Sequence, residues 1–478
     1  MIQATLLLSA AAISSGYNVS PKRTPMCAKY SGMVSTSEED MLYVANAAKA
    51  DFNNIIKTIW ETAEFPEFEL SNLYGNMLRG IFHDCAEFDV NSSDKLGCDG
   101  CLSGDEGNNG LASEGSIILT VIEDLWQKYC DKISRADFWA MMGKFTVEAS
   151  DETKSMNIKF SYGRPDSKSC DVVGRLPGHQ VGISEFNRVF ENQMQLTLYD
   201  AVALNGGHTL GHVHTDVSGF GFFRSKRELQ KEESTNGWDL EPHVFNSDYY
   251  SSLVEIPWIN IQRGRDRSKN FWKAGKGKGK ETIMLNADMI LAFFANTDKD
   301  LKRDPSGAHI GIIGEECSED AVDGEYGCFE KKRNNPGIGG WPSTYEQCRA
   351  YIENNGAFLR DFEYSYYKMI NTGFSVDGEQ QYGRSDKIGN LKSIELPPYF
   401  GVLADPGDFV KEESSEDSIE ATASATIDTG SGTDSSDPNS VIAVGIACGS
   451  AGFVLAGMAA FFMRKSSMNG KNEISELP

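Results

Sequence analysis

The sequence has too few basic residues for a nucleic-acid-binding protein. It carries 45 Lys and Arg against 69 Asp and Glu, which gives a formal net charge of −24 at pH 7. Because binding to phosphates needs clustered Lys and Arg, this balance argues against nucleic acid as a partner. The run G-K-G-K-G-K at 275–280 lacks Walker A spacing and is expected to be a solvated loop. Cys98-Asp-Gly-Cys101 has no second pair and no βαβ pattern near it, so a thioredoxin-like or zinc site is not supported.

Histidine is also scarce, and its distribution is uneven. The chain has seven histidines, and three of them lie in residues 200–214, D-A-V-A-L-N-G-G-H-T-L-G-H-V-H. If this segment is helical, His208 and His212 lie four apart on one face with His214 nearby, a spacing that suits zinc. Alternatively, His208 alone faces inward as an axial ligand, with Thr209 serving a second site. Core packing with surface imidazoles is the third interpretation, and the clustering makes it less attractive.

The two ends of the sequence predict an exported protein that is anchored in a membrane. Residues 1–16 have a short apolar run followed by Ser-Ser-Gly, the layout of a signal peptide, although no Lys or Arg precedes the run. Residues 441–463 contain no charge, and about 20 such residues let a helix cross the hydrocarbon core. Basic residues follow at once, so the positive-inside bias places the tail 464–478 in the cytosol. We therefore expect a single-pass type I membrane protein with its main domain extracellular or luminal.

Three further features agree with this topology. Residues 411–440 are rich in Ser, Thr, Asp and Glu and are expected to form a solvated stalk after a folded domain at 27–400. An exported chain can keep disulfides, and of the ten cysteines only Cys448 lies in the span. The other cysteines are odd in number, so at least one is free or intermolecular. Gly445 and Gly449 form one G-x-x-x-G pattern, through which two spans can pack as a dimer.

Two segments near the start of the domain read as helices, and the second contains reactive groups. Residues 38–62 have apolar side chains at helical spacing, and residues 73–85 are helical in pattern and end in R-G-I-F-H-D-C. Arg79 and His83 are four residues apart, so both side chains project from one helix face. This pair suits heterolysis of a polar bond, because imidazole moves a proton while guanidinium holds negative charge. An ordinary Arg and His on a helix surface is the alternative.

Two strings in the sequence resemble the signatures of a known protein family. The string R-G-I-F-H-D-C is similar to the distal helix signature of plant, fungal and bacterial type haem peroxidases, and A-L-N-G-G-H-T-L-G is similar to their proximal signature. Further matching positions are Asn108, Gly110, Leu111, Arg135, Ala136, Asp137, Trp139, Ala140, Gly163, Arg164, Asp166, Gly174, Arg175, Leu176 and Pro177. The resemblance implies an all-α fold of two lobes, with haem b between a distal lobe at about 38–170 and a proximal lobe at about 171–400.

The resemblance also implies roles for individual residues. His208 corresponds to the axial iron ligand and His83 to the distal acid/base catalyst. Arg79 would stabilise the leaving oxygen, Asn108 would orient His83 through a hydrogen bond, and Phe82 stands beside the distal histidine on the haem side. A neutral imidazole with a carboxylate behind it supplies electron density to iron.

Two more residues are expected near the axial histidine. The string M-L-N-A-D, 284–288, resembles the M-L-P-T-D of the family, so Asp288 is the candidate carboxylate for His208; a helix N-cap before Met289 is the alternative. The run containing Trp238 resembles the segment that carries a tryptophan under the haem in cytochrome c peroxidase and ascorbate peroxidase, where the indole can hold a radical. A plain core aromatic is the alternative for Trp238.

The resemblance further implies two cation sites. The proximal one, suited to calcium or potassium because its ligands are hard oxygens, would use Thr209, Asp239, Glu241, the Val244 carbonyl and Asn246. Asn246 replaces the usual Asp. The distal calcium site would use Asp84, Gly97 and Asp99, but Cys101 stands where a Ser ligand is expected.

Several positions do not match a single subtype of this family. Phe82 is typical of the secreted enzymes, whereas a tryptophan at position 238 is typical of the intracellular ones, so the chain resembles a hybrid. Val217 occupies the position of the ascorbate-contacting arginine, so ascorbate at that edge is not supported. A charged insertion at 224–234 precedes Trp238. Cys85 and Cys98 resemble the family's short-loop disulfide, worth about 3 kcal/mol if unstrained; the other cysteine pairings stay unassigned.

Together these features predict a membrane-anchored haem peroxidase. It would reduce hydrogen peroxide and oxidise a small-molecule or protein donor one electron at a time, with His83 moving the proton and Arg79 stabilising charge. Two rivals remain. A zinc hydrolase would use His208, His212 and His214, and a tethered interaction module would keep the peroxidase fold without turnover.

Overall fold

The computed structural model describes residues 27, 35–94, 96–111, 116–168, 170, 172–178, 186–222, 235–256, 258–263, 269–274, 281–292, 312–313, 343–379 and 388–399. All of them belong to the first of two units, Met1–Glu412; the second unit, Glu413–Pro478, lies outside the described residues. The expected signal peptide, stalk, span, cytosolic tail and charged insertion also lie outside them. Within the described ranges, none of the helices combines the length and apolar character needed to cross a bilayer.

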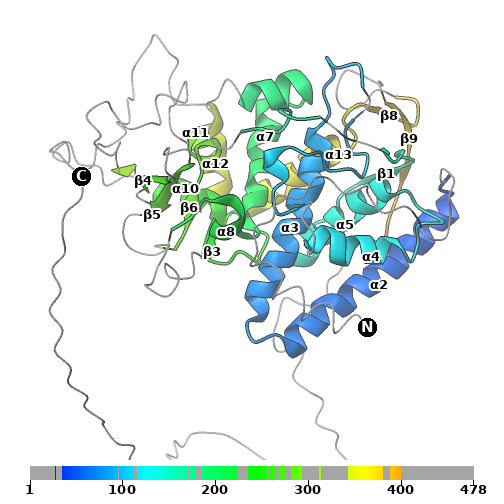
Figure 1. Cartoon of the computed structure of the whole chain (residues 1–478), viewed down its shortest axis with the longest axis horizontal. Coiled ribbons are helices and arrows are strands. Elements are labelled where there is room, and N and C mark those ends of the chain that lie inside the picture. The colour runs from blue at the N-terminus through cyan, green and yellow to red at the C-terminus, as the bar shows by residue number, and fades with distance from the viewer. Residues whose placement is uncertain are drawn as a thin grey trace, which may run out of the picture. The chain divides into compact units, whose positions relative to one another are not determined.

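Helices make up most of the described part of the chain (Figure 1). The α-helices are α2 Glu38–Thr62, α3 Pro66–Ala86, α4 Glu123–Trp126, α5 Arg135–Ser150, α7 Leu198–Asn205, α8 Thr215–Ser218, α10 Asp248–Glu255, α11 Asn286–Ala292, α12 Ser343–Glu353 and α13 Asn355–Ile370. In Figure 1, α2 to α5 lie together on one side, α10 to α12 lie with a small sheet on the other, and α7 lies between these groups.

Local signals explain where the first two helices begin. Ser37 caps α2 by accepting a hydrogen bond from the Asp40 N–H at 3.0 Å, and the first turn is acidic. The predicted range 38–62 is therefore confirmed. The next helix begins at Pro66 rather than near residue 73, because proline is favoured in a first helical turn. The longer α3 places Arg79 and His83 in its last two turns.

The expectation of an all-α fold is wrong in detail, because three small sheets accompany the helices. In the first sheet, β9 Gly389–Ile394 lies between β1 Phe160–Tyr162, which is antiparallel to it, and β8 Phe374–Val376, which is parallel to it. The second sheet pairs β2 His212–His214 with β3 Thr235–Gly237, with His212 opposite Gly237. The third has the order β6 Ile283–Met284, β5 Lys269–Ala274, β4 Trp258–Arg263 and β7 Ile312–Ile313, all antiparallel. The described fold is mainly helical, and it is not purely helical.

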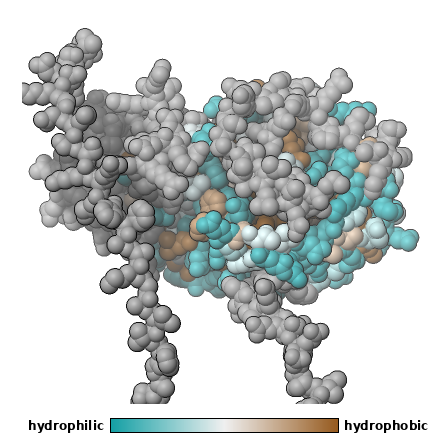
Figure 2. Space-filling model, turned by 60° about the horizontal axis from the view of Figure 1, so that its bottom comes forward, coloured by the Kyte–Doolittle hydropathy of each residue, from teal (hydrophilic) through white to brown (hydrophobic). Residues whose placement is uncertain are grey.

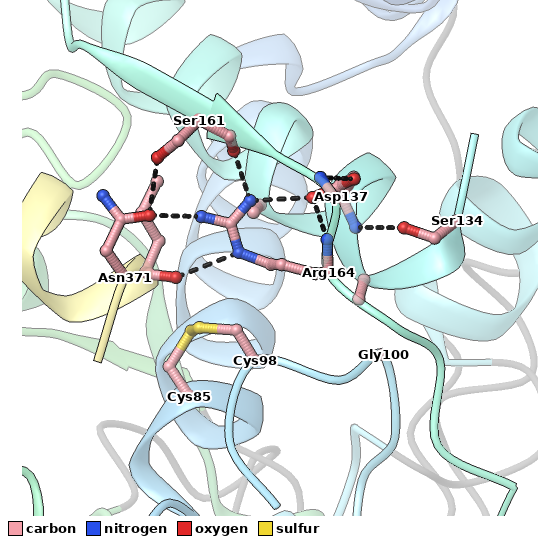
Figure 3. Close-up of polar contacts among 12 residues, drawn as sticks. Cys85, Cys98, Gly100, Ser134, Asp137, Ser161, Arg164 and Asn371 are labelled. Carbon is pink, nitrogen blue, oxygen red and sulfur yellow. Dashed lines mark hydrogen bonds and ion pairs between the residues drawn. A yellow bond between two sulfur atoms is a disulfide. The ribbon is translucent and has the colours of Figure 1, made fainter. Parts of the chain in front are cut away.

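A buried polar cluster joins distant parts of the domain (Figure 3). Arg164, just after β1, donates hydrogen bonds to the Asp137 carboxylate of α5 at 2.8 Å and to the Ser161 carbonyl. Its other nitrogens donate to the Ile370 carbonyl at 2.9 Å and to the Asn371 amide oxygen at 2.8 Å, at the end of α13. The Arg164 and Asp137 side chains are fully buried. This cluster therefore ties α5, β1 and α13 together.

Three disulfides lie in the described residues. They join Cys27 to Cys130, Cys85 to Cys98, and Cys101 to Cys170. The predicted pairing of Cys85 with Cys98 is confirmed; it appears in Figure 3 below the arginine cluster. Cys348 is a free, buried thiol, and Cys317 and Cys328 lie outside the described residues.

Polar residues cover most of the described surface on the face shown in Figure 2, with apolar residues interspersed among them. Six large apolar or aromatic side chains are well exposed: Tyr43, Phe65, Val173, Tyr199, Leu240 and Tyr364. They come from several different parts of the sequence, and exposed apolar residues of this kind are normal on a folded protein.

Candidate active site

His208 lies on a tight turn that follows α7. Thr197 and Asp200 form a capping box at the start of this helix, which ends at Asn205 and passes into a 3₁₀ turn, Gly206–Thr209. Only glycine fits at position 206, because a Cβ there would lie 2.4 Å from both the Phe358 ring and the Tyr250 hydroxyl. The two glycines thus end the helix and let the turn pack closely.

The helical spacing assumed for His208 and His212 is wrong, because His212 and His214 belong to strand β2. The His212 Nδ1 atom is 2.7 Å from the Ser71 hydroxyl, and the His214 Nε2 atom is 3.0 Å from the Asn72 amide oxygen. Within the described ranges, no three His, Cys, Asp or Glu residues gather in a way that would hold a metal ion. The zinc interpretation of the three histidines is therefore wrong.

The hydrogen bonds of His212 and His214 instead connect β2 to α3. At the same place the backbones come very close: a Cβ on Gly75 would lie 2.5 Å from the Gly211 Cα, and Gly211 has a φ of +92°. The segment that follows His208 is thus held directly against the helix that carries Arg79 and His83.

Asp288 is bound to His208. Its Oδ1 atom lies 2.6 Å from the His208 Nδ1 atom and also accepts from the Tyr249 hydroxyl at 2.8 Å and the Asn205 amide at 3.1 Å. Its Oδ2 atom accepts from the Leu285 N–H at 2.7 Å. The residue therefore stabilises the first turn of α11 as well as the histidine, although it is not the N-cap, since α11 begins at Asn286.

The carboxylate is kept ionised in spite of full burial. Burial acts to raise the pKa of Asp288, but the interaction with His208, together with hydrogen bonds from Leu285 and Tyr249, holds this pKa below its ordinary value. An ionised carboxylate on Nδ1 fixes the tautomer, so the His208 Nε2 atom carries a lone pair.

Trp238 lies flat against His208. The two ring centroids are 4.2 Å apart with an angle of 4° between the planes, and the indole is buried. Among the described contacts, Asp288 accepts hydrogen bonds from His208, Tyr249, Asn205 and the Leu285 N–H. The described contact between Trp238 and the axial-ligand candidate is ring stacking.

On α3, Arg79 and His83 are both held by the segment around residues 103–109. The Arg79 guanidinium donates to the Gly107 carbonyl at 2.6 Å and to the Asn109 carbonyl at 3.1 Å. The His83 Nδ1 atom is 2.9 Å from the Asn108 amide oxygen, which is the hydrogen bond that the resemblance implies. Burial lowers the pKa of Arg79 to about 10, so it stays charged at neutral pH.

The direction of the Asn108 amide decides which nitrogen of His83 is the base. The Asn108 NH₂ group donates to Glu87 at 3.1 Å and to Ser103 at 3.1 Å, so its oxygen faces His83 and accepts. The Nδ1 atom of His83 therefore carries the proton and Nε2 is free to accept one. Burial first, and then the charge of Arg79, lower the pKa of His83 to about 3, so the imidazole is neutral.

Glu87 is a functional neighbour that the sequence reasoning missed. It is buried and accepts from the Ser103 N–H at 3.1 Å as well as from Asn108, and burial raises its pKa to about 8. Its position four residues after His83 was the available signal, because both then project from the same helical face.

Phe82 forms the apolar part of this region. Its ring stacks on Phe190 with centroids 5.9 Å apart and meets the His83 ring edge-on at 5.8 Å. Phe82, Arg79 and His83 are each half-buried.

The donor set fits a haem. His83 and His208 each use Nδ1 in a hydrogen bond, and for Nε2 of either residue the described contacts include no protein partner. The His208 side chain is 37% exposed although its carboxylate partner is fully buried. Such residues can hold an iron porphyrin by one Nε2 and leave the other for its oxidant.

The proximal cation candidates come together in part. The Thr209 hydroxyl is 2.6 Å from the Asp239 carboxylate, 3.3 Å from the Val244 carbonyl and 3.4 Å from the Asn246 amide oxygen. Burial raises the pKa of Asp239 to about 8. Glu241 contributes a backbone N–H to Asp239, while its side chain is exposed. Four oxygen-bearing groups therefore converge, and the fifth does not.

The distal candidates are arranged differently. The Asp84 carboxylate accepts hydrogen bonds from the N–H groups of Asp99, Gly100 and Cys101 at 3.1 to 3.3 Å, and Gly97 packs near Phe88 and Ile388. Burial raises the pKa of Asp84 to about 7, and burial together with the charge of Asp84 raises the pKa of Asp99 well above its ordinary value. The buried Asp99 Oδ2 atom has no hydrogen-bond partner among the described contacts, and the distal calcium site stays a prediction.

A mainly helical fold that combines a carboxylate-bound histidine, a stacked tryptophan and a nearby Arg–His pair is the arrangement of a haem peroxidase. The comparison with protein families agrees: the family model described as "Peroxidase" matches residues 55–303, which is more than half of the 478-residue chain. This chain belongs to the peroxidase family.

Individual relatives are more distant. The chain is 33% identical over 194 residues to L-ascorbate peroxidase 3 of Arabidopsis thaliana and 32% identical over 178 residues to cytosolic L-ascorbate peroxidase 2 of Oryza sativa subsp. japonica. These alignments cover 39% and 37% of this chain and 61% and 64% of the two relatives. It is also 23% identical over 352 residues to a protein of Mycosarcoma maydis whose name gives it as an inferred heme-binding peroxidase, covering 72% of this chain and 85% of that one.

Proposed function

We propose that this protein is a haem peroxidase that reduces hydrogen peroxide and oxidises a donor one electron at a time. The single observation that carries the proposal is the pair of oriented histidines. His208 is fixed by Asp288 at 2.6 Å, His83 is fixed by Asn108 at 2.9 Å, and both keep Nε2 for a ligand or substrate. A packing role for either residue would not need these two orienting partners.

Haem b would be held through the His208 Nε2 atom and would supply the iron chemistry that breaks the peroxide O–O bond. The protein supplies the orientation of that ligand. Asp288 keeps the Nδ1 proton engaged, which raises the basicity of His208.

Proton movement is assigned to His83. Its neutral Nε2 atom accepts a proton from hydrogen peroxide and returns it to the oxygen that leaves as water. Asn108 holds the ring during both transfers. The Arg79 guanidinium, anchored on the Gly107 and Asn109 carbonyls, stabilises negative charge on the departing oxygen.

Electrons for the reaction would come from an external donor. Trp238 is the proposed first carrier on the His208 side, because its ring is in contact with the imidazole. Two relatives are named for ascorbate. In this chain Val217 stands where the family resemblance places an ascorbate-contacting arginine. The proposed donor is therefore a phenol-like small molecule or a protein rather than ascorbate.

The proposal extends to a structural cation and to the compartment. Calcium, or potassium, would neutralise the buried Asp239 with oxygens from Thr209, Val244 and Asn246. The three disulfides support an exported domain, as expected for a type I membrane protein with a signal peptide and a C-terminal span. Dimerisation through the G-x-x-x-G pattern of that span belongs to the same proposal.

The test is peroxide turnover by the full chain after haem is added. A Soret band should appear with the wild type and weaken with His208→Ala. Guaiacol oxidation should fall about 10²- to 10⁴-fold in His83→Ala, the range for losing a general acid–base group. His243→Gln, a partly exposed histidine away from these contacts, is the matched control. Equal rates in wild type and His83→Ala would instead favour a non-catalytic interaction module on a peroxidase fold.

A further inference from the structure

A series of tyrosines begins beside the His208–Asp288 pair and leads away from it. Tyr249 of α10 donates to Asp288 at 2.8 Å, and its ring centroid is 6.0 Å from that of His208. The Tyr249 and Tyr250 centroids are 5.0 Å apart, and those of Tyr250 and Tyr351 of α12 are also 5.0 Å apart. All three tyrosines are buried. The rings therefore form a continuous contact path inside the protein.

The path reaches the surface at Tyr199. Tyr351 donates to the Asp361 carboxylate of α13 at 3.0 Å, and the Tyr199 hydroxyl donates to the same carboxylate oxygen. Gln347 links the two residues as well, since its amide donates to the Tyr199 carbonyl at 2.9 Å and to the Tyr351 hydroxyl at 2.6 Å. Tyr199 is 52% exposed. In Figure 1, α7 and α13 lie near the middle of the folded unit, and α10 and α12 lie beside α7.

The hydroxyl partners differ along this path in a way that suits redox chemistry. Oxidising a tyrosine by one electron makes its phenol strongly acidic, so an oxidised tyrosine needs a base for its proton. Carboxylates serve the two ends, Asp288 at Tyr249 and Asp361 at Tyr351 and Tyr199. In the middle, Tyr250 donates to the Val202 carbonyl at 2.7 Å, which cannot take the proton. Tyr250 therefore acts as a contact ring between two oxidisable ends.

We propose that Tyr199 is a second oxidation site, at which bulky phenolic donors that cannot approach the haem deliver electrons through Tyr351, Tyr250 and Tyr249. This inference rests on the proposed peroxidase function, because hydrogen peroxide supplies the oxidising equivalents. Phenols are the chemical class that fits, since a tyrosyl group and a phenol exchange a hydrogen atom with little change in free energy.

The electrons and protons balance as follows. Tyr199 loses one electron, which moves inward along the path, and its O–H proton moves to the Asp361 carboxylate. The phenol donor then gives one hydrogen atom to Tyr199, which restores the O–H bond and leaves a phenoxyl product. Asp361 releases its proton to water, and one proton is consumed per electron as peroxide becomes water. Two donor molecules are thus oxidised for each peroxide reduced.

The first test locates the radical rather than measuring turnover. The haem-loaded full chain is treated with hydrogen peroxide and a nitroso spin trap without donor, then digested and analysed by mass spectrometry. A trap adduct is expected on Tyr199 in the wild type and in Tyr43→Phe, a matched exposed tyrosine outside the path. It should disappear in Tyr199→Phe and decrease in Tyr351→Phe. A wild type without an adduct on Tyr199 would overturn the inference.

The second test uses two donors of the same chemistry and different size. Guaiacol can diffuse to the haem, whereas a phenol coupled to a high-mass dextran cannot. Tyr199→Phe should slow oxidation of the dextran-bound phenol about tenfold while guaiacol oxidation is unchanged. Equal rates with the dextran-bound phenol, together with normal guaiacol oxidation, refute the tyrosine path and leave the proposed function standing. Absence of wild-type turnover with either donor overturns the proposed function and the path with it.

Discussion

Replacing Arg164 by leucine should destabilise the folded protein strongly, because the arginine is the only side-chain cation bound to the buried Asp137 among the described contacts. Leucine fills part of the space but removes the guanidinium donors from the Asp137 carboxylate and from three further oxygens, those of the Ser161 and Ile370 carbonyls and of the Asn371 amide. Removing one partner of a buried pair typically costs about 3–5 kcal/mol. We expect about 3 kcal/mol, since the N–H groups of residues 163 and 164 still donate to Asp137 at 2.7 and 3.2 Å.

Burial already raises the pKa of Asp137 in spite of Arg164, so proton uptake by the carboxyl will limit the loss in the variant. The measurement is urea unfolding of the full chain, followed by circular dichroism, with the free energy of unfolding extrapolated to water.

Two comparisons make this prediction specific. Asp94→Asn breaks the partly exposed pair with Arg175, whose side chains are 34% and 12% exposed, and should cost about 1 kcal/mol or less. Adding Asp137→Asn to Arg164→Leu should restore part of the stability, because no unpaired charge is then buried. The reasoning is refuted if Arg164→Leu costs no more than Asp94→Asn, or if the double variant is less stable than Arg164→Leu.

The other predictions concern the site. Asn108→Val removes a hydrogen bond worth about 0.5–1.5 kcal/mol, so stopped-flow rate constants with peroxide should fall about two- to tenfold; an unchanged rate would show that Asn108 does not position His83. Asp288→Asn should weaken haem binding about 10- to 100-fold in a spectroscopic titration, and affinity equal to wild type would contradict its role behind His208. Because burial and Arg79 lower the pKa of His83 to about 3, the imidazole stays unprotonated at mildly acidic pH. The peroxide rate should therefore fall only as pH approaches 3, and a midpoint near 6.5 would disprove the shift.

Local sequence signals predicted some elements and missed others for physical reasons. The bounds of α2 follow from a capping serine and an apolar stripe, both of which are readable within one segment. The early start of α3 was also readable, since Pro66 marks a first helical turn. The pairing of β4 with β5 and β7 depends on contacts between separate segments, so no pattern within one strand could reveal it.

The site shows the same division. The family pattern brought His83, Asn108, His208 and Asp288 into the correct pairs, although the last two are separated by 80 residues. Tyr249 was missed because its role depends on a bond to Asp288 that arises only from packing α10 against α11. The zinc hypothesis was wrong because it assumed that residues 208–214 form a helix. The structure has a turn at Gly206–Thr209 followed by strand β2.

The hydrogen bonds between β2 and α3 have a consequence for haem binding. Strand β2 follows His208 directly and α3 carries His83, so the Ser71–His212 and Asn72–His214 bonds hold the two reactive histidines at a set separation before any group is bound. A binding site that is already assembled loses little conformational entropy when its ligand enters. The two backbones also cannot come closer, because a Cβ on Gly75 would lie 2.5 Å from the Gly211 Cα. We therefore expect the apoprotein to present both histidines already oriented, so that haem binding would require little rearrangement of α3 and β2.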